Sequence, residues 1–556
     1  MKFRILVIET PNINTMKIKL LFFLFFITSN YFVAQTIEDA WVYFKDKPSE
    51  SSFLATPITM LSQRAIDRRT RYNIPFDSKD VPVELSYINQ IKNQNGITVF
   101  AKSKWLNALH IQGTQIDINN LLNLTFVASV NFADKSLNSG GKSILKNRFV
   151  EKKDKLDFAT NFNYGNATNQ IQMLKGDVLH QNNFTGEGME IAIIDAGFPN
   201  VDTYAAFQRI RDNNQILGGY DFVNRNDNFY TGHYHGMAVL STIAGYVDNQ
   251  FVGTAPDAKF YLFISEDDSQ ESPLEESLWV EAAEKADSLG VDVINTSLGY
   301  TTFDKPNYNY SYSDMDGNTT FISRGAEIAF SRGMILVNAA GNEGSSSWHY
   351  ISAPADAVSV LSIGAVDATG TIAGFSSYGP TSDDRVKPDV DAQGANVYII
   401  NSAGSIATSN GTSFASPIMT GVITCLWEAY PNKTNAEIIQ MVKESGSLYA
   451  NPTEQEGYGI PNFESVYNTL NIETLPNESN EASIYPNPIK DKVTIKFPKN
   501  TEEMEITILN LLGKNMVYKS VLKDKPTLDI SYLPNGLYMM QLVYNNQVST
   551  IKMLKN

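Results

Sequence analysis

The stretch Glu190-Ile-Ala-Ile-Ile-Asp195-Ala-Gly is an apolar run of β-strand length that ends in an aspartate and a small-residue turn. Such a run is typical of a strand buried on both faces. We expect the Asp195 carboxylate to project from the carboxyl edge of a parallel sheet, where open α/β folds place their sites. Taken alone, this aspartate could equally be a cap or a loop residue.

Apolar runs alternate with helical patterns on both sides of this stretch. The predicted strands are 189–194, 259–264, 291–295, 335–339 and 358–366, and the predicted helices are 235–246, 274–288 and 321–332. This alternation predicts right-handed crossovers and a mostly parallel sheet with helices on both faces. The fold class expected for this region is therefore three-layer α/β.

The flanking regions have other patterns. Strand patterns at 40–44 and 97–101, helical patterns at 61–71 and 83–92, and a later helix–strand pair predict a small α+β domain. Near the other end, short alternating strands predict a β-sandwich, at 492–497, 503–509, 536–544 and 548–553.

These patterns divide the chain into six parts. The expected bounds are a signal peptide 1–35, an α+β domain 36–135, a charged linker 136–162, the α/β domain 163–470, a polar linker 471–481 and the β-sandwich 482–556. In the first part, two lysines precede the apolar run 20–27, which is too short to span a bilayer, and Met16 is the expected true start. We expect export and no transmembrane segment.

Charge and cysteine content narrow the function classes. The formal net charge of -16 argues against general affinity for nucleic acid or anionic lipid, since both require a positive field. Cys425 is the single cysteine, so an intramolecular disulfide and a zinc site built from several thiolates are excluded. Within its apolar run, Cys425 is expected to be a packed core thiol.

Four polar residues have the types that amide hydrolysis requires. His235 opens an apolar helical run, Asn342 follows a predicted strand, and Ser413 precedes the helical run 418–430 in Gly411-Thr-Ser-Phe-Ala-Ser-Pro. Together with Asp195 they could supply a base, an oxyanion donor, a nucleophile and a group that orients the base. His233 and His235 could instead form a metal pair, but residues at i and i+2 of a helix cannot face one ion.

In the order of these segments the chain resembles the subtilases, the subtilisin-like serine proteases. The matching blocks are Ile193-Ile-Asp195, His235-Gly, Asn338-Ala-Ala-Gly-Asn342 and Gly411-Thr-Ser-Phe-Ala-Ser-Pro. The resemblance implies a serine endopeptidase with an Asp195–His235–Ser413 triad, an Asn342 oxyanion donor, an acyl-enzyme intermediate, protein or peptide substrates and no cofactor for the chemistry.

The same resemblance implies two walls of a substrate-binding cleft. Ser297, Leu298 and Gly299 would pair with the substrate backbone, and Ala339, Ala340 and Gly341 would form the facing wall. One departure is Met237, which stands where the family usually has threonine. The alternative is therefore an inactive subtilase scaffold that acts as a surface adhesin or binding module. An esterase of another α/β fold lacks the Gly-x-Ser-x-Gly motif around Ser413.

Structural calcium is a further implication of the family. Asp314, Asp316 and Asn318 place three oxygen ligands close together, but the glycine is not where an EF-hand loop requires it, and no distal glutamate follows. A polar surface loop is the preferred interpretation of this segment.

Both flanking domains also resemble known modules. Residues 36–135 resemble subtilase propeptides, which would make the chain a zymogen with its own propeptide as an intramolecular inhibitor. The first predicted helix carries four arginines, Arg64, Arg68, Arg69 and Arg71. They could face the acidic catalytic unit, but a solvated helix face is the preferred interpretation.

The last domain resembles the C-terminal sorting domains of type IX secretion. Its matching blocks are Ala482-Ser-Ile-Tyr-Pro-Asn-Pro488, Leu512-Gly-Lys, Leu533-Pro-Asn-Gly-Leu-Tyr538 and a late Lys552. The resemblance implies the type IX machinery as a partner, and export through the periplasm and outer membrane of a Gram-negative bacterium to the surface or the medium. The alternative is an ordinary carbohydrate- or protein-binding β-sandwich.

Overall fold

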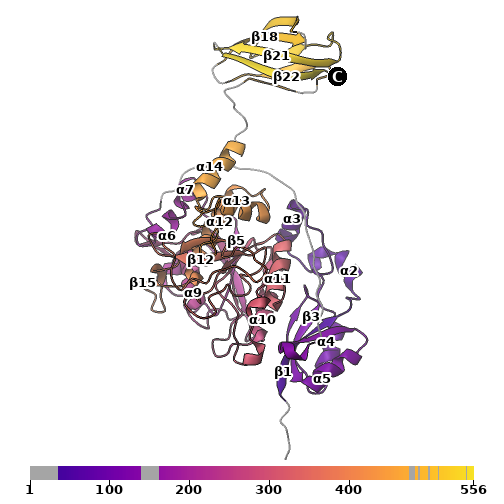
Figure 1. Ribbon diagram of the computed structural model, residues 1–556, viewed down its shortest axis with the longest axis vertical. Coiled ribbons are helices and arrows are strands. Elements are labelled where there is room, and N and C mark those ends of the chain that lie inside the picture. The colour runs from indigo at the N-terminus through magenta and orange to yellow at the C-terminus, as the bar shows by residue number, and fades with distance from the viewer. Residues whose placement is uncertain are drawn as a thin grey trace, which may run out of the picture. The chain divides into compact units, whose positions relative to one another are not determined.

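The computed structural model describes residues 36–138, 162–474 and 482–555, the last range with gaps at 486–488, 499–500, 511–512 and 546. The predicted signal peptide and most of both predicted linkers lie outside these ranges. The chain forms two compact units, Met1–Val466 and Tyr467–Asn556, which are described separately (Figure 1). No helix in the described ranges is long and apolar enough to cross a membrane.

A seven-stranded sheet forms the middle layer of the first unit. Its order is β13-β12-β11-β10-β5-β9-β6, and every ladder is parallel. The strands are β5 (Glu190–Asp195), β6 (Ile216–Asp221), β9 (Lys259–Ile264), β10 (Val293–Thr296), β11 (Ile335–Ala339), β12 (Leu361–Val366) and β13 (Val390–Gln393). The chain passes from β9 to β10 across β5, so β5 lies at the point where the strand order reverses. Open α/β sheets form their crevices there.

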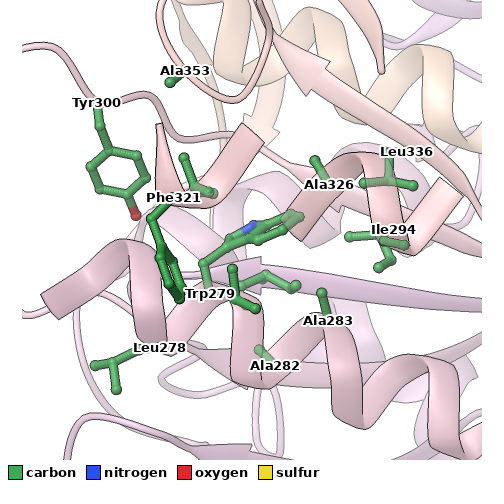
Figure 2. Packing of buried hydrophobic residues seen from close by; sticks show 14 of the residues in the cluster. Leu278, Trp279, Ala282, Ala283, Ile294, Tyr300, Phe321, Ala326, Leu336 and Ala353 are labelled. Atoms are coloured by element: carbon green, nitrogen blue, oxygen red, sulfur yellow. The ribbon is translucent and has the colours of Figure 1, made fainter. Parts of the chain in front are cut away.

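Helices cover both faces of this sheet, which confirms the predicted fold class. α9 (His235–Ala244) and α12 (Thr412–Ala429) pack together on one face, followed by α13 (Asn435–Glu444). α10 (Pro273–Leu289) and α11 (Phe321–Ser331) cover the other face. Figure 2 shows Trp279 of α10 between Phe321 and the sheet residue Ile294. Its indole Nε1 donates to Thr296 Oγ1 at 3.0 Å.

The N-terminal domain is an antiparallel sheet of order β2-β3-β1-β4. Its strands are β1 (Ile37–Phe44), β2 (Thr98–Ser103), β3 (Ala108–Thr114) and β4 (Val127–Phe132), and its helices are α2 (Glu50–Leu54), α3 (Gln63–Arg71), α4 (Leu85–Lys92) and α5 (Gln115–Asn120). One side of the sheet shares a core with α10 and α11, where Trp41 stacks on Phe321 with ring centroids 5.0 Å apart.

Strand β3 was not predicted. His110 interrupts its apolar pattern, yet this residue is buried, because its ring nitrogens contact Ser277 Oγ of α10 at 2.9 Å and Asp39 Oδ1 at 3.0 Å. The polar residue lies at a contact between domains, which the local sequence pattern does not reveal.

The second unit holds two antiparallel sheets, β16-β17-β20 and β19-β18-β21-β22. The strands are β16 (Ser483–Tyr485), β17 (Lys492–Lys496), β18 (Glu503–Asn510), β19 (Asn515–Leu522), β20 (Thr527–Asp529), β21 (Gly536–Tyr544) and β22 (Gln547–Lys555). Val493 of one sheet and Ile506 and Met540 of the other lie in one buried cluster, so the sheets form a sandwich. The edge strand β19, in which Tyr518 is exposed, was not predicted.

Candidate active site

Three predicted residues lie near the carboxyl edge of the large sheet. Asp195 is the last residue of β5, His235 is the first residue of α9, and Ser413 lies in the first turn of α12 (Figure 1). Backbone bonds hold the loop after β5 against the loop before α9, with His233 N donating to Ala196 O at 2.9 Å. A Cβ at Gly236 would lie 2.9 Å from Asp195 Cβ. Glycine after His235 therefore lets α9 approach the end of β5.

Asp195 and His235 form a hydrogen-bonded pair. His235 Nδ1 lies 2.8 Å from Asp195 Oδ1, and the Asp195 side chain is fully buried. Burial lowers the pKa of His235, but the Asp195 charge and hydrogen bond outweigh it, so the pKa is raised above its usual 6.5. With Nδ1 on the carboxylate, Nε2 remains to exchange a proton with another group.

Ser413 is tied to the backbone of the neighbouring loop. Its Oγ donates to Ser297 O at 3.2 Å, and Ser297 Oγ donates to Ser413 O at 2.9 Å. Pro417 explains the second bond, because proline has no N–H to donate to the carbonyl four residues earlier in the helix. The exchange fixes the start of α12 against the end of β10.

Two N–H donors flank a space beside Ser413. Asn342 Oδ1 accepts from Thr412 N at 2.9 Å and from Thr412 Oγ1 at 3.1 Å, which identifies Nδ2 as the free end of the amide. A Cβ at Gly411 would lie 3.6 Å from Ser413 N and 3.8 Å from both Nδ2 and Oδ1 of Asn342. Gly411 has φ 148° and leaves this space open. A developing oxyanion fits between two such donors.

The two predicted cleft walls lie at the same edge. Ser297, Leu298 and Gly299 follow β10, whereas Ala339 ends β11 and leads into Ala340 and Gly341. Asn338 Nδ2 donates to Leu298 O at 3.1 Å and to Ala339 O at 2.8 Å, linking the walls. Gly299 is exposed and Leu298 half-buried. The exposed wall can accept an extended peptide.

Thr412 and Glu266 were not among the predicted site residues. Glu266 accepts from Ser265 Oγ and from Tyr300 Oη, both at 2.6 Å, and burial raises its pKa to about 7. Its charge contributes to the raised pKa of His235. Its place in the chain could have indicated a site residue, because Glu266 lies two residues beyond the end of β9, the strand that pairs with β5.

The carboxylates of the candidate calcium segment, for which a polar surface loop was the preferred interpretation, are engaged by protein donors. Asp314 Oδ2 pairs with Lys135 Nζ at 2.6 Å, and Asp316 Oδ1 accepts from the N–H groups of Asn318 and Thr319. Among the described residues, no group of three or more histidine, cysteine or carboxylate side chains could hold a metal ion. The loop does not fit a calcium site. Cys425 is buried.

Three family models match successive parts of the chain. Residues 39–153 match the peptidase S8 propeptide domain of Bacteroidota, residues 186–460 match the subtilase family, and residues 483–556 match the secretion system C-terminal sorting domain.

Curated relatives and a solved structure are similar to part of the chain. Subtilisin NAT of Bacillus subtilis subsp. natto is 30% identical over 313 residues, which cover 56% of this chain and 72% of that protein. Subtilisin of Bacillus pumilus is 30% identical over 299 residues, covering 53% of this chain and 96% of that protein. The solved structure of the MycP3 protease from the type VII (ESX-3) secretion system matches with 19% identity and a TM-score of 0.44, covering 57% of this chain and 92% of that chain.

Proposed function

The chain belongs to the subtilase family of serine proteases, and on this premise we propose that it is a serine endopeptidase whose catalytic triad is Asp195, His235 and Ser413. Its C-terminal sorting domain directs export by the type IX secretion system of a Gram-negative Bacteroidota cell, and implies an N-terminal signal peptide.

The proposed reaction follows from the position of each donor and acceptor. His235 Nε2 takes the Ser413 proton as Oγ attacks the scissile carbonyl carbon, and Asp195 stabilises the imidazolium. The Ser413 N–H and Asn342 Nδ2 donate to the oxyanion. His235 then protonates the leaving amine, and water, activated by the same imidazole, releases the acyl group. The chemistry requires no cofactor.

The Ser413 hydroxyl must change its hydrogen-bond partner in the proposed reaction. It donates to Ser297 O. We expect a rotation of this side chain to direct the hydroxyl towards His235, whose ring lies beside that of Phe414, the residue after Ser413, with centroids 6.0 Å apart. A substrate backbone pairing with residues 297–299 would favour this rotation by crowding the Ser297 carbonyl.

The observation that carries the proposal is the space between Ser413 N and Asn342 Nδ2. Thr412 orients the amide, and Gly411 keeps the gap free of a side chain. A scaffold used only for adhesion would have no need of two N–H donors beside a serine.

The flanking regions complete the proposal. Residues 36–135 act as the propeptide and inhibitor, processing occurs within 136–162, 163–470 form the catalytic domain, and 471–481 link it to the sorting domain 482–556. The propeptide packs on α10 and α11, which supports this division.

A fluorophosphonate probe tests the function, because it labels only an activated serine. Processed wild-type chain should be labelled and should cut a peptide library internally. Ser413→Ala should lose both properties, whereas the control Ser405→Ala, at an exposed turn, should keep both. A folded, processed wild-type chain without labelling would contradict the protease and favour the inactive scaffold.

A further inference from the structure

The N-terminal domain contacts the catalytic domain in two separate places. One is its sheet, which packs on the sides of α10 and α11. The other is residues 62–80, which leave the sheet after β1, include α3 and return at α4. We call residues 62–80 the latch. Contrary to the preferred sequence interpretation, three of its arginines face the catalytic domain: Arg64, Arg68 and Arg69. Arg71 is exposed.

The latch caps the C-terminal end of α10. The last carbonyl groups of a helix have no partner within the helix. Here five successive carbonyl oxygens, those of residues 287–291, all accept hydrogen bonds from the latch. Ser62 N donates to Ser288 O at 2.8 Å, and Ser62 Oγ donates to Leu289 O at 2.7 Å. The arginines supply the other three donors, and their positive charge also suits a helix C-terminus.

Buried charges lie beneath this cap. Arg68 Nη2 contacts Asp287 Oδ1 at 2.5 Å, and Arg69 Nη2 contacts Asp287 Oδ2 at 2.8 Å and Asp80 Oδ1 at 2.9 Å. Asp287 and Arg69 are fully buried. Burial raises the pKa of Asp287, but the two arginines outweigh it and hold that pKa below the usual value. Both partners of an Arg–Asp pair buried between two domains are needed for docking, since removal of either side chain would leave the other charge buried and unpaired.

Contacts around the rim enlarge the surface. Arg64 pairs with Asp292 and, at 3.4 Å, with Glu190 Oε2. The Tyr72 ring stacks on Trp427 with centroids 6.0 Å apart. A Cβ at Gly290 would lie 2.7 Å from Ala65 N. The absence of a side chain at Gly290 therefore leaves room for α3 to lie directly on the helix end.

The latch contacts the amino edge of the large sheet, which is opposite the edge that carries the triad. Glu190, which Arg64 holds, begins β5, and Asp195 ends it. At the usual rise per residue, the two ends of this strand are about 17 Å apart. A cut in the linker after residue 138 leaves every contact of the latch intact.

We propose that the amino edge of the sheet is a docking surface for the latch that keeps residues 36–138 bound after the linker is cut, independently of the substrate cleft. The inference rests on the proposed role of this domain as propeptide. The partner that fits the surface is a helix with a serine as its N-cap residue and with arginines at the second, sixth and seventh positions after that serine.

The test uses the full chain with Ser413→Ala and a site for an added protease within residues 139–161. After cutting, size-exclusion chromatography measures how fast the N-terminal fragment separates. Arg64→Ala, whose side chain is 37% exposed and easily tolerated, should speed separation about ten-fold. Arg68→Ala with Arg69→Ala should speed it further. Lys92→Ala removes an exposed charge from α4 and should leave the rate unchanged.

Two outcomes would overturn the latch. One is that the N-terminal fragment of the Ser413→Ala chain, which carries no latch substitution, has already separated fully at the first measurement after cutting. The other is an Arg64→Ala chain that separates at the rate of Lys92→Ala while circular dichroism shows both folded. Because every chain carries Ser413→Ala, these results do not depend on catalysis, and probe labelling of the wild type separately tests the protease.

Discussion

The two ends of β5 show opposite ways of using polar side chains. At the carboxyl end, the proposed reaction has the Ser413 hydroxyl change its hydrogen-bond partner from Ser297 O to His235. The side chain of His235 is 26% exposed. At the amino end, Asp287 and Arg69 are fully buried, and Asp287 is held by two arginines. Chemistry requires groups that can exchange partners, whereas docking requires groups that cannot. Changes at one end should therefore leave the function of the other end intact.

The largest expected effect is at the carboxyl end, for Asp195→Asn. After the linker of the folded chain is cut at an added protease site and the N-terminal fragment is released, kcat for a fluorogenic peptide should be about 10⁴-fold lower than that of wild type treated in the same way, because the imidazole loses its orientation. Catalysis requires neutral His235, whose pKa is raised above 6.5. Wild-type activity should therefore rise as the pH rises through the pKa of His235. Without the carboxylate this pKa falls, and the residual activity should rise at lower pH. The control Asp316→Asn should match wild type.

Gly411→Ala should lower kcat about 10²- to 10³-fold, since the new methyl group enters the space between the two oxyanion donors. The substitution also strains the backbone at φ 148°. Gly374→Ala is the matched control, because a Cβ there meets no atom within 4 Å. Retention of the cut N-terminal fragment should be unchanged in both. Full activity in Gly411→Ala would contradict the assigned oxyanion space.

Asp287→Asn tests the amino end and should show the reverse pattern. Loss of one partner from a buried ion pair should weaken retention of the cut fragment by at least about a hundred-fold. Once the fragment is gone, kcat should stay within about two-fold of wild type, because Asp287 lies at the far edge of the sheet. Asp212→Asn, at an exposed position, provides the control for both measurements. A large fall in kcat would show that the two edges are coupled.

The smallest effect should come from salt. Raising NaCl from about 0.1 to about 1 M shortens the screening length from about 10 to about 3 Å, but buried pairs respond little. Separation of the cut fragment should therefore accelerate only a few-fold. Arg64→Ala should remove most of this response, since Arg64, with a side chain 37% exposed, is the most exposed of the three arginines that face the catalytic domain. Acceleration beyond a hundred-fold would mean that exposed charges carry the docking.

The sequence predicted the centre of the sheet well, for a physical reason. Strands buried on both faces are apolar throughout, so β9 and β11 were predicted with their observed bounds. Strands β6 and β13 were missed because Gly218 and Gly219 interrupt one and Asp391 and Gln393 interrupt the other. A Cβ at Gly219 would lie 2.2 Å from Leu262 O, so contact with the neighbouring strand requires the glycine.

The active site and the latch also differ in how far the local sequence predicts them. Residues at strand ends and helix starts carry a local signature, and Asp195, His235 and Ser413 lie where that signature placed them. The helix pattern around Arg68 and Arg69 was also predicted, but not its burial. Their partner Asp287 is more than two hundred residues away in the chain, and no local pattern distinguishes a solvated arginine from one paired across a domain contact.

The capped helix end has a consequence for how long the mature enzyme lasts. When residues 62–80 are lost, the carbonyls of 287–291 turn from protein donors to water, and a chain that later unfolds has no cap with which to rebuild this end of α10. We therefore expect the mature enzyme to last only as long as it stays folded, so that a half-life at a given temperature should describe it better than a melting midpoint.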